Sequence, residues 1–219
     1  ILKDEPLIFV EVAFTRGIGK SIQQLIKPKT KESLNYDTAT FYSINNCRDG
    51  LMRVTLGNFL IKRVVFEIQL ENPKIKNFGT LSPLPGFADW FFSLTKNQLQ
   101  DILKNYDILK LEFLKSPQLK IGDPKIIKEE ETLKKLVSHY LINEKINNKP
   151  LNPVSRFHLG NGASIHDIII NGNTSDYGYS ESFGIMVNYG YQLDKLEHIH
   201  EDFITKGKIS YSEKIKKYV

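Results

Sequence analysis

Cysteine is almost missing from this sequence, since Cys47 is the only one among 219 residues. A single cysteine excludes an intramolecular disulfide and a zinc site built from several thiolates. The scarcity favours a reducing compartment. We therefore expect an intracellular protein, located in the mitochondrion, the peroxisome or the cytoplasm.

Long apolar runs are missing as well. The longest candidate, residues 59–68, is interrupted by Lys62, Arg63 and Glu67, whereas a spanning helix needs roughly 20 apolar residues. The opening that follows Ile1 has neither the cationic start nor the apolar stretch of a signal peptide. The final Tyr-Val is not a Ser-Lys-Leu peroxisomal address. We expect no membrane span and no secretion, and the start suggests a piece of a longer chain.

A block of charge of one sign is also missing. Lysine and arginine exceed aspartate and glutamate by 30 to 25, a formal charge of +5, but the lysines are scattered among Ile and Asn. Aromatic and basic residues do not alternate along one stripe, so we expect no nucleic-acid partner. The excess of positive charge either reflects compositional drift at solvent-exposed positions, without a function, or helps to attract an anionic ligand.

What is present is enough apolar sequence for a core, at 41% of residues, in one large domain or two small ones. Short β-branched or aromatic runs predict strands at residues 7–14, 39–44, 78–82, 155–158, 163–170 and 184–191. Apolar residues at helical spacing predict helices across residues 60–68, 99–106 and 133–141, with one or two further turns at 21–27. The last two long helices form an inserted helical layer between two groups of strands.

The junction that leads into the helix at residues 60–68 has the features of a phosphate-binding turn. A strand, a loop with Gly50 and Gly57, and a helix start can point backbone N–H groups at a pyrophosphate. The alternative is a plain helix start with Thr55 as its cap. There is no Walker sequence and no Gly-x-Gly-x-x-Gly, so spacing alone leaves both readings open.

Ser82 ends a predicted strand directly before Pro83-Leu-Pro-Gly86. Such a turn can fix a hydroxyl in one direction at a cleft, or the serine can simply form the turn. It is not part of a Gly-x-Ser-x-Gly elbow, which argues against that class of hydrolase.

His158 lies between two apolar residues just before Gly160-Asn-Gly162, so a strand would aim its side chain opposite to theirs. It is either a core histidine or a functional one. His198 and His200 lie in an acidic stretch, which indicates weak metal affinity or a solvated surface.

Four long segments, in the right order, resemble the malonyl-CoA decarboxylase family. They are residues 56–65, 80–87, 152–163 and 184–189, and residues 7–15 and 41–44 also fit. The resemblance covers the chain from about residue 5 to residue 191. It implies an α/β (α+β) fold like that of the GNAT acyltransferases, with a mixed central sheet flanked by helices and a helical insertion. It also implies that residues 1–219 are the catalytic domain, without the N-terminal helical domain through which family members form homo-oligomers.

The same resemblance implies roles for individual residues. The family's catalytic serine and histidine fall on Ser82 and His158, and a tyrosine near the active centre falls on Tyr191. We take Tyr191 and Asn161 as candidates for positioning the substrate, with a structural role as the alternative. The CoA pyrophosphate loop falls on Met52, Arg53, Val54, Thr55, Leu56, Gly57 and Asn58.

The sequence departs from the family pattern at two positions of that loop. Arg53 stands where members commonly have glycine, and it either obstructs the phosphate or binds it as a cation. Thr55 stands where animal members have an acidic residue, which removes a possible partner of the catalytic groups. The segment between residues 90 and 152 is also shorter than in the family and unlike it.

The reaction that the resemblance implies is the decarboxylation of malonyl-CoA to acetyl-CoA and carbon dioxide. We expect Ser82 and His158 to hold the carboxylate and the carbonyl out of one plane, and His158 to direct protonation of the carbanion. We expect no metal and no cofactor, because the thioester itself accepts the electrons. The alternatives are a GNAT-type acyltransferase and a CoA-binding remnant that has lost its activity.

Overall fold

The computed structural model describes residues 8–27, 35–46, 57–116 and 119–219. A six-stranded mixed sheet runs through this part of the chain. Its strands are β1 (Ile8–Thr15), β2 (Thr38–Asn46), β3 (Asn77–Thr80), β4 (Ser82–Pro83), β7 (Ser164–Ile169) and β8 (Met186–Tyr191). The order is β1-β2-β3-β8-β4, and β7 pairs with β8; β2 and β3 are parallel, while the other paired strands are antiparallel. The strands predicted at residues 7–14, 39–44, 163–170 and 184–191 are confirmed, and those predicted at 78–82 and 155–158 differ from the structure as described below.

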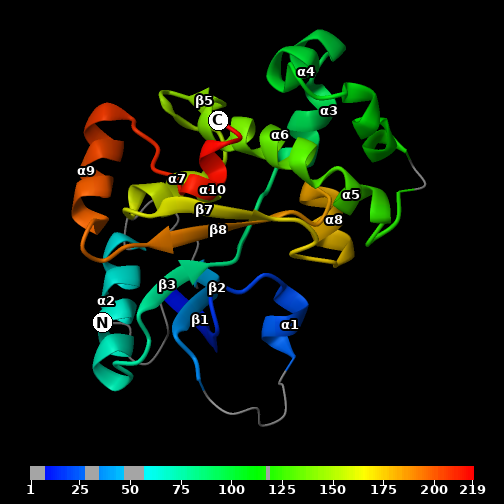
Figure 1. Ribbon diagram of the computed structural model, residues 1–219. Coiled ribbons are helices and arrows are strands. Elements are labelled where there is room, and N and C mark those ends of the chain that lie inside the picture. Colours follow the sequence, from blue (N-terminus) through cyan, green and yellow to red (C-terminus); the bar gives the residue numbers. More distant parts are fainter. Residues whose placement is uncertain (1–7, 28–34, 47–56, 117–118) are drawn as a thin grey trace.

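Helices cover the sheet and form a separate layer beside it (Figure 1). The longest are α2 (Gly57–Glu71), α6 (Glu130–Ile142) and α9 (Leu196–Lys206). The shorter ones are α1 (Ile22–Ile26), α3 (Phe87–Ser93), α4 (Lys96–Leu103), α5 (Pro124–Lys128), α7 (Pro153–Gly160), α8 (Asp176–Ser182) and α10 (Glu213–Lys216). A 3₁₀ segment, Ile108–Lys115, follows α4, and a small hairpin joins β5 (Lys145–Ile146) to β6 (Lys149–Pro150). The predicted helical insertion corresponds to α3 to α6.

The strand predicted at residues 78–82 is interrupted at Leu81, and this break shapes the centre of the sheet. β3 pairs with β8 through Phe78 and Gly79, and pairing resumes only at Ser82. Side chains bridge the gap: the Asn188 amide donates to the Thr80 carbonyl at 2.7 Å, and the Tyr189 N–H donates to the Thr80 Oγ1 at 3.2 Å. The backbone groups near the break are therefore satisfied without a continuous ladder.

The predicted strand at residues 155–158 is wrong, because this segment lies inside helix α7. Asn152 caps the helix by accepting from the Ser155 N–H at 2.8 Å, and Pro153 occupies the first turn. An Asn cap followed by proline is a strong helix start. A four-residue apolar window was too short to separate strand from helix, and the capping signal just before it decides the conformation.

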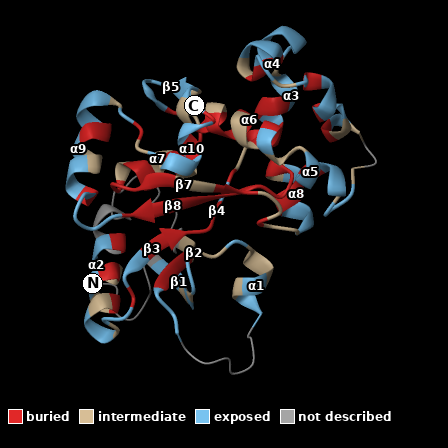
Figure 2. Ribbon diagram, in the orientation of Figure 1, coloured by how far each residue is buried: buried red, intermediate tan, exposed pale blue. Residues whose placement is uncertain are grey.

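The core is continuous from the sheet into the helical layer. Figure 2 shows buried residues concentrated along β7 and β8 and on the inner faces of the surrounding helices. Within the layer, Phe87, Phe91, Trp90, Tyr140 and Phe183 pack as neighbouring rings, mostly edge to face or tilted. This packing holds α3, α6 and α8 against one another, so the insertion is a rigid support for the end of the sheet that carries Ser82.

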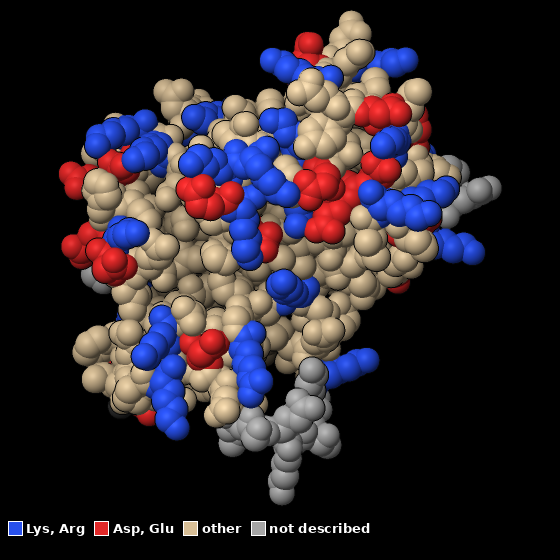
Figure 3. All heavy atoms as spheres, viewed as in Figure 1, with Lys and Arg blue, Asp and Glu red and all other residues tan. Residues whose placement is uncertain are grey.

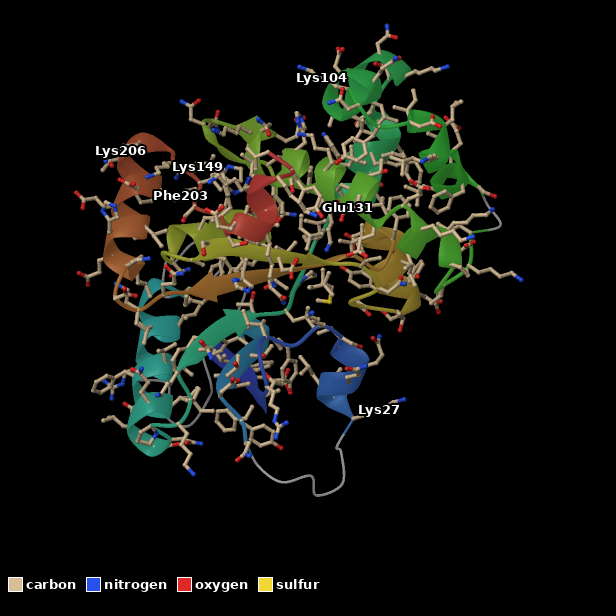
Figure 4. All side chains as sticks on the ribbon, in the orientation of Figure 1. Lys27, Lys104, Glu131, Lys149, Phe203 and Lys206 are labelled. Atoms are coloured by element: carbon tan, nitrogen blue, oxygen red, sulfur yellow. The ribbon has the colours of Figure 1, made fainter. Side chains whose placement is uncertain are left out.

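The residues that follow the last helix, α10, bind to α6. Glu131, labelled in Figure 4, accepts from the Tyr218 hydroxyl at 2.9 Å and from the Lys217 ammonium at 3.1 Å. On the face shown in Figure 3, basic side chains lie among acidic ones. No helix in the described ranges is both long and apolar enough to cross a bilayer.

Candidate active site

Ser82 is held at the point where the sheet opens and the chain turns. It begins β4 opposite Val187 of β8 and is buried. The turn that follows is fixed at the carbonyl of Pro85, which accepts from the Tyr140 hydroxyl at 3.1 Å and from the Asn152 amide at 3.0 Å. Ser82 therefore has a defined position on a turn anchored from two helical elements.

His158 reaches the same place from helix α7. Its imidazole Nε2 lies 2.9 Å from the Ser82 Oγ, and its Nδ1 lies 2.8 Å from the Tyr191 hydroxyl. The structure thus brings together three residues that sequence analysis selected, from β4, α7 and β8. All three are buried: Ser82 is 5% exposed, His158 3% and Tyr191 4%.

Burial decides the protonation states of this group. It lowers the pKa of His158 to about 3 and raises the pKa of Tyr191 well above its usual value, because the charged forms lose their solvation. At neutral pH the imidazole is therefore neutral and the phenol keeps its proton. Among the described residues the Tyr191 O–H has no other acceptor than Nδ1, so we take the phenol as the donor, which puts the single ring proton of His158 on Nε2, facing Ser82.

Two aromatic rings fix the plane of the imidazole. The ring of Tyr189 stacks on it with centroids 4.5 Å apart at 25°, and the ring of Phe157 meets it edge-on at 5.0 Å and 79°. The two in-plane hydrogen bonds set where the ring lies, while the stack limits its tilt. His158 is consequently held in one orientation.

Ser82 and His158 line a cavity of about 420 Å³. The other lining residues are mostly apolar: Phe41, Tyr42, Ser43, Ile44, Leu81, Pro83, Pro153, Val154 and Phe157. A hydroxyl and an imidazole in such walls are polar groups in a medium of low polarity, where they act strongly on any charge that develops nearby.

The other residues selected from the sequence have different outcomes. Asn161 ends helix α7, where its amide donates to the Phe157 carbonyl at 2.7 Å. Of the predicted CoA loop, residues 52–56 lie outside the described residues, while Gly57 and Asn58 begin helix α2. The loop and the positioning role of Asn161 both stay predictions.

The histidines outside the site do not gather into a metal centre. His200 donates from Nδ1 to the Gly160 carbonyl, 2.7 Å away, and the Nε2 of the exposed His198 lies 3.7 Å from the Asp202 carboxylate. Across the residues that the structure describes, no three His, Cys, Asp or Glu side chains cluster as metal ligands would.

Sequence analysis missed three residues that hold the site together. Thr80 accepts a hydrogen bond from Ser82 at 2.8 Å, Tyr189 stacks on His158, and Asn152 joins α7 to the turn after Ser82. Two of them had a readable signal, since residues two apart on a strand share a face: Thr80 lies two before Ser82, and Tyr189 two before Tyr191. The signal for Asn152 was the following proline.

Comparison with known proteins shows the family of this chain. A family model described as the malonyl-CoA decarboxylase C-terminal domain matches residues 1–219. The chain belongs to the malonyl-CoA decarboxylase family. The predicted family is thereby confirmed.

Relatives within the malonyl-CoA decarboxylase family are similar over nearly the whole chain. The mitochondrial malonyl-CoA decarboxylase of the goose Anser anser anser is 36% identical over 98% of this chain and 47% of its own length. The crystal structure of malonyl-CoA decarboxylase from Rhodopseudomonas palustris is 39% identical, with a TM-score of 0.89 over 99% of this chain and 50% of that one. The chain therefore spans about half the length of the relatives it matches.

A more distant structure supports the fold alone. A GNAT-like decarboxylase in complex with isobutyryl-CoA is 15% identical over 88% of this chain, with a TM-score of 0.51. The GNAT-like fold expected for a malonyl-CoA decarboxylase domain is confirmed by this likeness and by the mixed sheet flanked by helices.

Proposed function

We propose that this chain decarboxylates malonyl-CoA to acetyl-CoA and carbon dioxide, with Ser82 and His158 as its catalytic residues. The observation that carries the proposal is the buried, hydrogen-bonded contact between the two side chains on the wall of a cavity, in a chain of the malonyl-CoA decarboxylase family.

The reaction breaks one carbon–carbon bond. Its electron pair moves onto the thioester, which becomes an enolate, and carbon dioxide leaves. The α-carbon of the enolate then takes up one proton to give the acetyl thioester. The protein has to stabilise negative charge on the thioester oxygen and to provide that proton, and the thioester accepts the electrons, so the proposal involves no cofactor.

In its neutral form His158 can stabilise the enolate through its Nε2–H and then give that proton to the α-carbon, which leaves an imidazolate that the Tyr191 O–H stabilises at Nδ1 until solvent returns a proton. Since burial lowers its pKa to about 3, the imidazole carries no charge at neutral pH and presents one N–H at Nε2. Neutral imidazole can polarise a carbonyl as a hydrogen-bond donor. We assign the Nε2–H of His158 to the developing enolate, and assign to the Tyr191 hydroxyl the task of supporting the opposite nitrogen.

Ser82 provides the second polar group beside the thioester. We assign it to hold the malonyl group so that the bond to the leaving carboxylate lies out of the plane of the thioester carbonyl, where its electrons overlap with the carbonyl π system. The apolar wall formed by Phe41, Leu81 and Phe157 surrounds the carboxylate with poor solvation, which favours its loss as neutral carbon dioxide.

Malonyl-CoA and acetyl-CoA are the partners that this proposal names. We place the CoA pyrophosphate at residues 52–58, at the start of helix α2, on the strength of the family resemblance and of the positive end of that helix. The goose relative is named as mitochondrial. We propose an intracellular location for this chain and, following its family, assembly into homo-oligomers as part of a longer protein.

Ser82→Ala and His158→Asn test the proposal in a coupled assay of acetyl-CoA formation from malonyl-CoA. Each change is expected to lower turnover about 10²- to 10⁴-fold, while acetyl-CoA binding, measured by calorimetry, persists. Ser138→Ala and His166→Asn are the matched controls, because they alter a buried serine and a half-buried histidine away from the cavity.

The controls are expected to keep wild-type turnover. Wild-type turnover in either site variant would contradict the role assigned to that residue. Transfer of acetyl groups from acetyl-CoA to a panel of amines, with no carbon dioxide released from malonyl-CoA, would contradict the proposed reaction itself.

A further inference from the structure

Thr80 occupies the break in the sheet and contacts Ser82 directly. It is the last residue of β3, 1% exposed, and separated from Ser82 only by Leu81. Its Oγ1 accepts two hydrogen bonds, one from the Tyr189 backbone N–H at 3.2 Å and one from the Ser82 hydroxyl at 2.8 Å. A threonine oxygen has two lone pairs, so both are used.

The Tyr189 N–H is a donor that cannot change its role, since a backbone amide has no acceptor capacity. It holds the Thr80 oxygen as an acceptor at a fixed place on the sheet. The Ser82 hydroxyl has a single hydrogen, and the geometry directs that hydrogen to Thr80. A lone pair of the Ser82 Oγ therefore faces the His158 Nε2, 2.9 Å away.

We propose that Thr80 is a positioning residue that turns the Ser82 hydroxyl hydrogen away from His158, so that Ser82 accepts from the imidazole Nε2–H. The hydrogen bonds of the site then run in one direction, from Tyr191 to His158, from His158 to Ser82 and from Ser82 to Thr80. Threonine at this position fixes the tautomer of the imidazole from the serine side, while Tyr191 fixes it from the other side.

This direction is opposite to that in serine hydrolases, where the serine donates to histidine and becomes a nucleophile. Here Ser82 is not activated for attack, and the imidazole presents an N–H in place of a basic lone pair. In the substrate-free chain that N–H points at Ser82, and we expect the thioester oxygen to share it when the substrate binds, so the arrangement suits stabilisation and protonation of an enolate and disfavours an acyl-enzyme. This consequence for turnover rests on the proposed decarboxylation, whereas the direction of the hydrogen bonds does not.

The tautomer of His158 can be measured without any substrate. In protein labelled with ¹⁵N at the histidine rings, the two nitrogens of a neutral imidazole have well-separated chemical shifts, and the spectrum of His158→Asn identifies the His158 signals. The expected wild-type result is a neutral ring protonated at Nε2. A wild-type ring protonated at Nδ1 would overturn the proposal.

Thr80→Val removes the acceptor and keeps the shape of the side chain. The Ser82 hydrogen is then free to turn to Nε2, so the His158 signals are expected to shift toward the Nδ1–H form or to broaden by exchange. With malonyl-CoA we expect kcat to fall about 10- to 100-fold through misorientation, with KM changed much less. Thr80→Ser keeps the oxygen and is expected to restore both the spectrum and most of kcat.

Thr40→Val is the matched control, because Thr40 is also a buried threonine whose Oγ1 bonds a hydroxyl, that of Thr15 at 2.8 Å, and a backbone N–H, that of Gly19 at 3.0 Å. It should lose comparable stability and keep the His158 spectrum. A Thr80→Val protein with the wild-type spectrum and kcat would overturn the proposal, as would a folded Thr80→Ser protein that resembles Thr80→Val.

Two further measurements distinguish a failure of the variant to fold from a failure of the proposed function. If Thr80→Val does not fold, as judged by circular dichroism, the ¹⁵N spectra of His158 in Thr80→Ala and in the wild type test the role of Thr80 in its place. If the wild-type chain does not decarboxylate malonyl-CoA, the proposed function fails. The ¹⁵N spectra of His158 in the wild type and in Thr80→Val still show whether Thr80 sets the tautomer.

Discussion

At the scale of single residues, the site depends on a histidine that stays neutral. His158 has a pKa of about 3 in the folded chain because it is buried, against about 6.5 for an exposed imidazole. Between these two pH values the unfolded chain binds one more proton than the folded chain. Stability from this residue is therefore complete above about pH 6.5 and is lost as the pH falls toward 3, by up to about 1.4 kcal/mol per pH unit.

His158→Asn should remove this contribution to the pH dependence. In urea unfolding between pH 7 and pH 4, the free energy of unfolding of the wild type is expected to fall more steeply than that of the variant, by about 1 kcal/mol per unit. The carboxylates are the same in both proteins and cancel in the comparison. Parallel slopes would show that His158 titrates normally in the folded chain.

Tyr189 offers a second prediction, because its ring and its hydroxyl have different surroundings. The ring stacks on His158, while the buried hydroxyl interacts with the Ser155 side chain but, within the described residues, makes no hydrogen bond of good geometry. Tyr189→Phe is expected to keep turnover and to change stability by less than about 1 kcal/mol, since no hydrogen bond is lost. Tyr189→Leu loses the stack, worth about 0.5–1.5 kcal/mol, and should lower kcat up to about tenfold.

The two variants are compared by kcat and by thermal unfolding. Equal kcat for Tyr189→Phe and Tyr189→Leu would show that the ring has no part in holding the imidazole.

Single residues also mark the limit of what could be predicted from the sequence. The local sequence patterns around Ser82 and His158 did not decide whether these residues have structural or catalytic roles. Only the family resemblance identified them as catalytic candidates. The spacing of Thr80, two residues before Ser82, was readable, but its role was not, because that role depends on a hydrogen bond to Ser82 across a break in the strand. That break is a property of pairing with β8, which lies more than 100 residues away in the sequence.

At the scale of elements, helix α7 and the turn after Ser82 are joined through one side chain. Asn152 caps α7 through the Ser155 N–H and donates to the Pro85 carbonyl, and it is fully buried. Asn152→Ala is expected to cost about 1–2 kcal/mol in urea unfolding. Because α7 carries His158 and the turn carries Ser82, we expect kcat to fall as well, by about tenfold or more.

Thr95→Ala is the control for this change. It breaks the capping box of α4, formed with Gln98, and should cost about 1 kcal/mol without affecting kcat. Equal kcat values in the two variants would mean that the link through Asn152 does not set the distance between Ser82 and His158.

Elements differ in how well they could be predicted. Short β-branched or aromatic runs in the sequence predict strands β1 and β2. Apolar residues at helical spacing predict the long helices α2 and α6. Helices α7 and α3 are seven or eight residues long, and apolar residues in so short a window fit strand and helix equally. Their caps and their packing against β8 and α8 decide the conformation.

At the scale of the whole molecule, the site exists only when distant segments meet. Ser82 and His158 are 76 residues apart, and His158 and Tyr191 are 33 apart. A ligand of this site should bind the folded chain alone and stabilise it by mass action, by about 2.7 kcal/mol at a concentration 100 times Kd. For a chain of this size we expect acetyl-CoA to raise Tm by roughly 5–10 °C.

Differential scanning calorimetry with increasing acetyl-CoA measures this shift, and acetyl phosphate serves as the ligand control. No rise in Tm at any acetyl-CoA concentration up to several millimolar would contradict a CoA-thioester site in this chain.

Release of carbon dioxide from malonyl-CoA tests whether Ser82 and His158 act together on the thioester. With the wild type, Ser82→Ala, His158→Asn and the double variant assayed side by side, each single change is expected to lower kcat about 10²- to 10⁴-fold. The double variant should be little worse than either, because the two residues act as one unit. Near-wild-type kcat in either single variant, or additive losses in the double variant, would contradict this joint action.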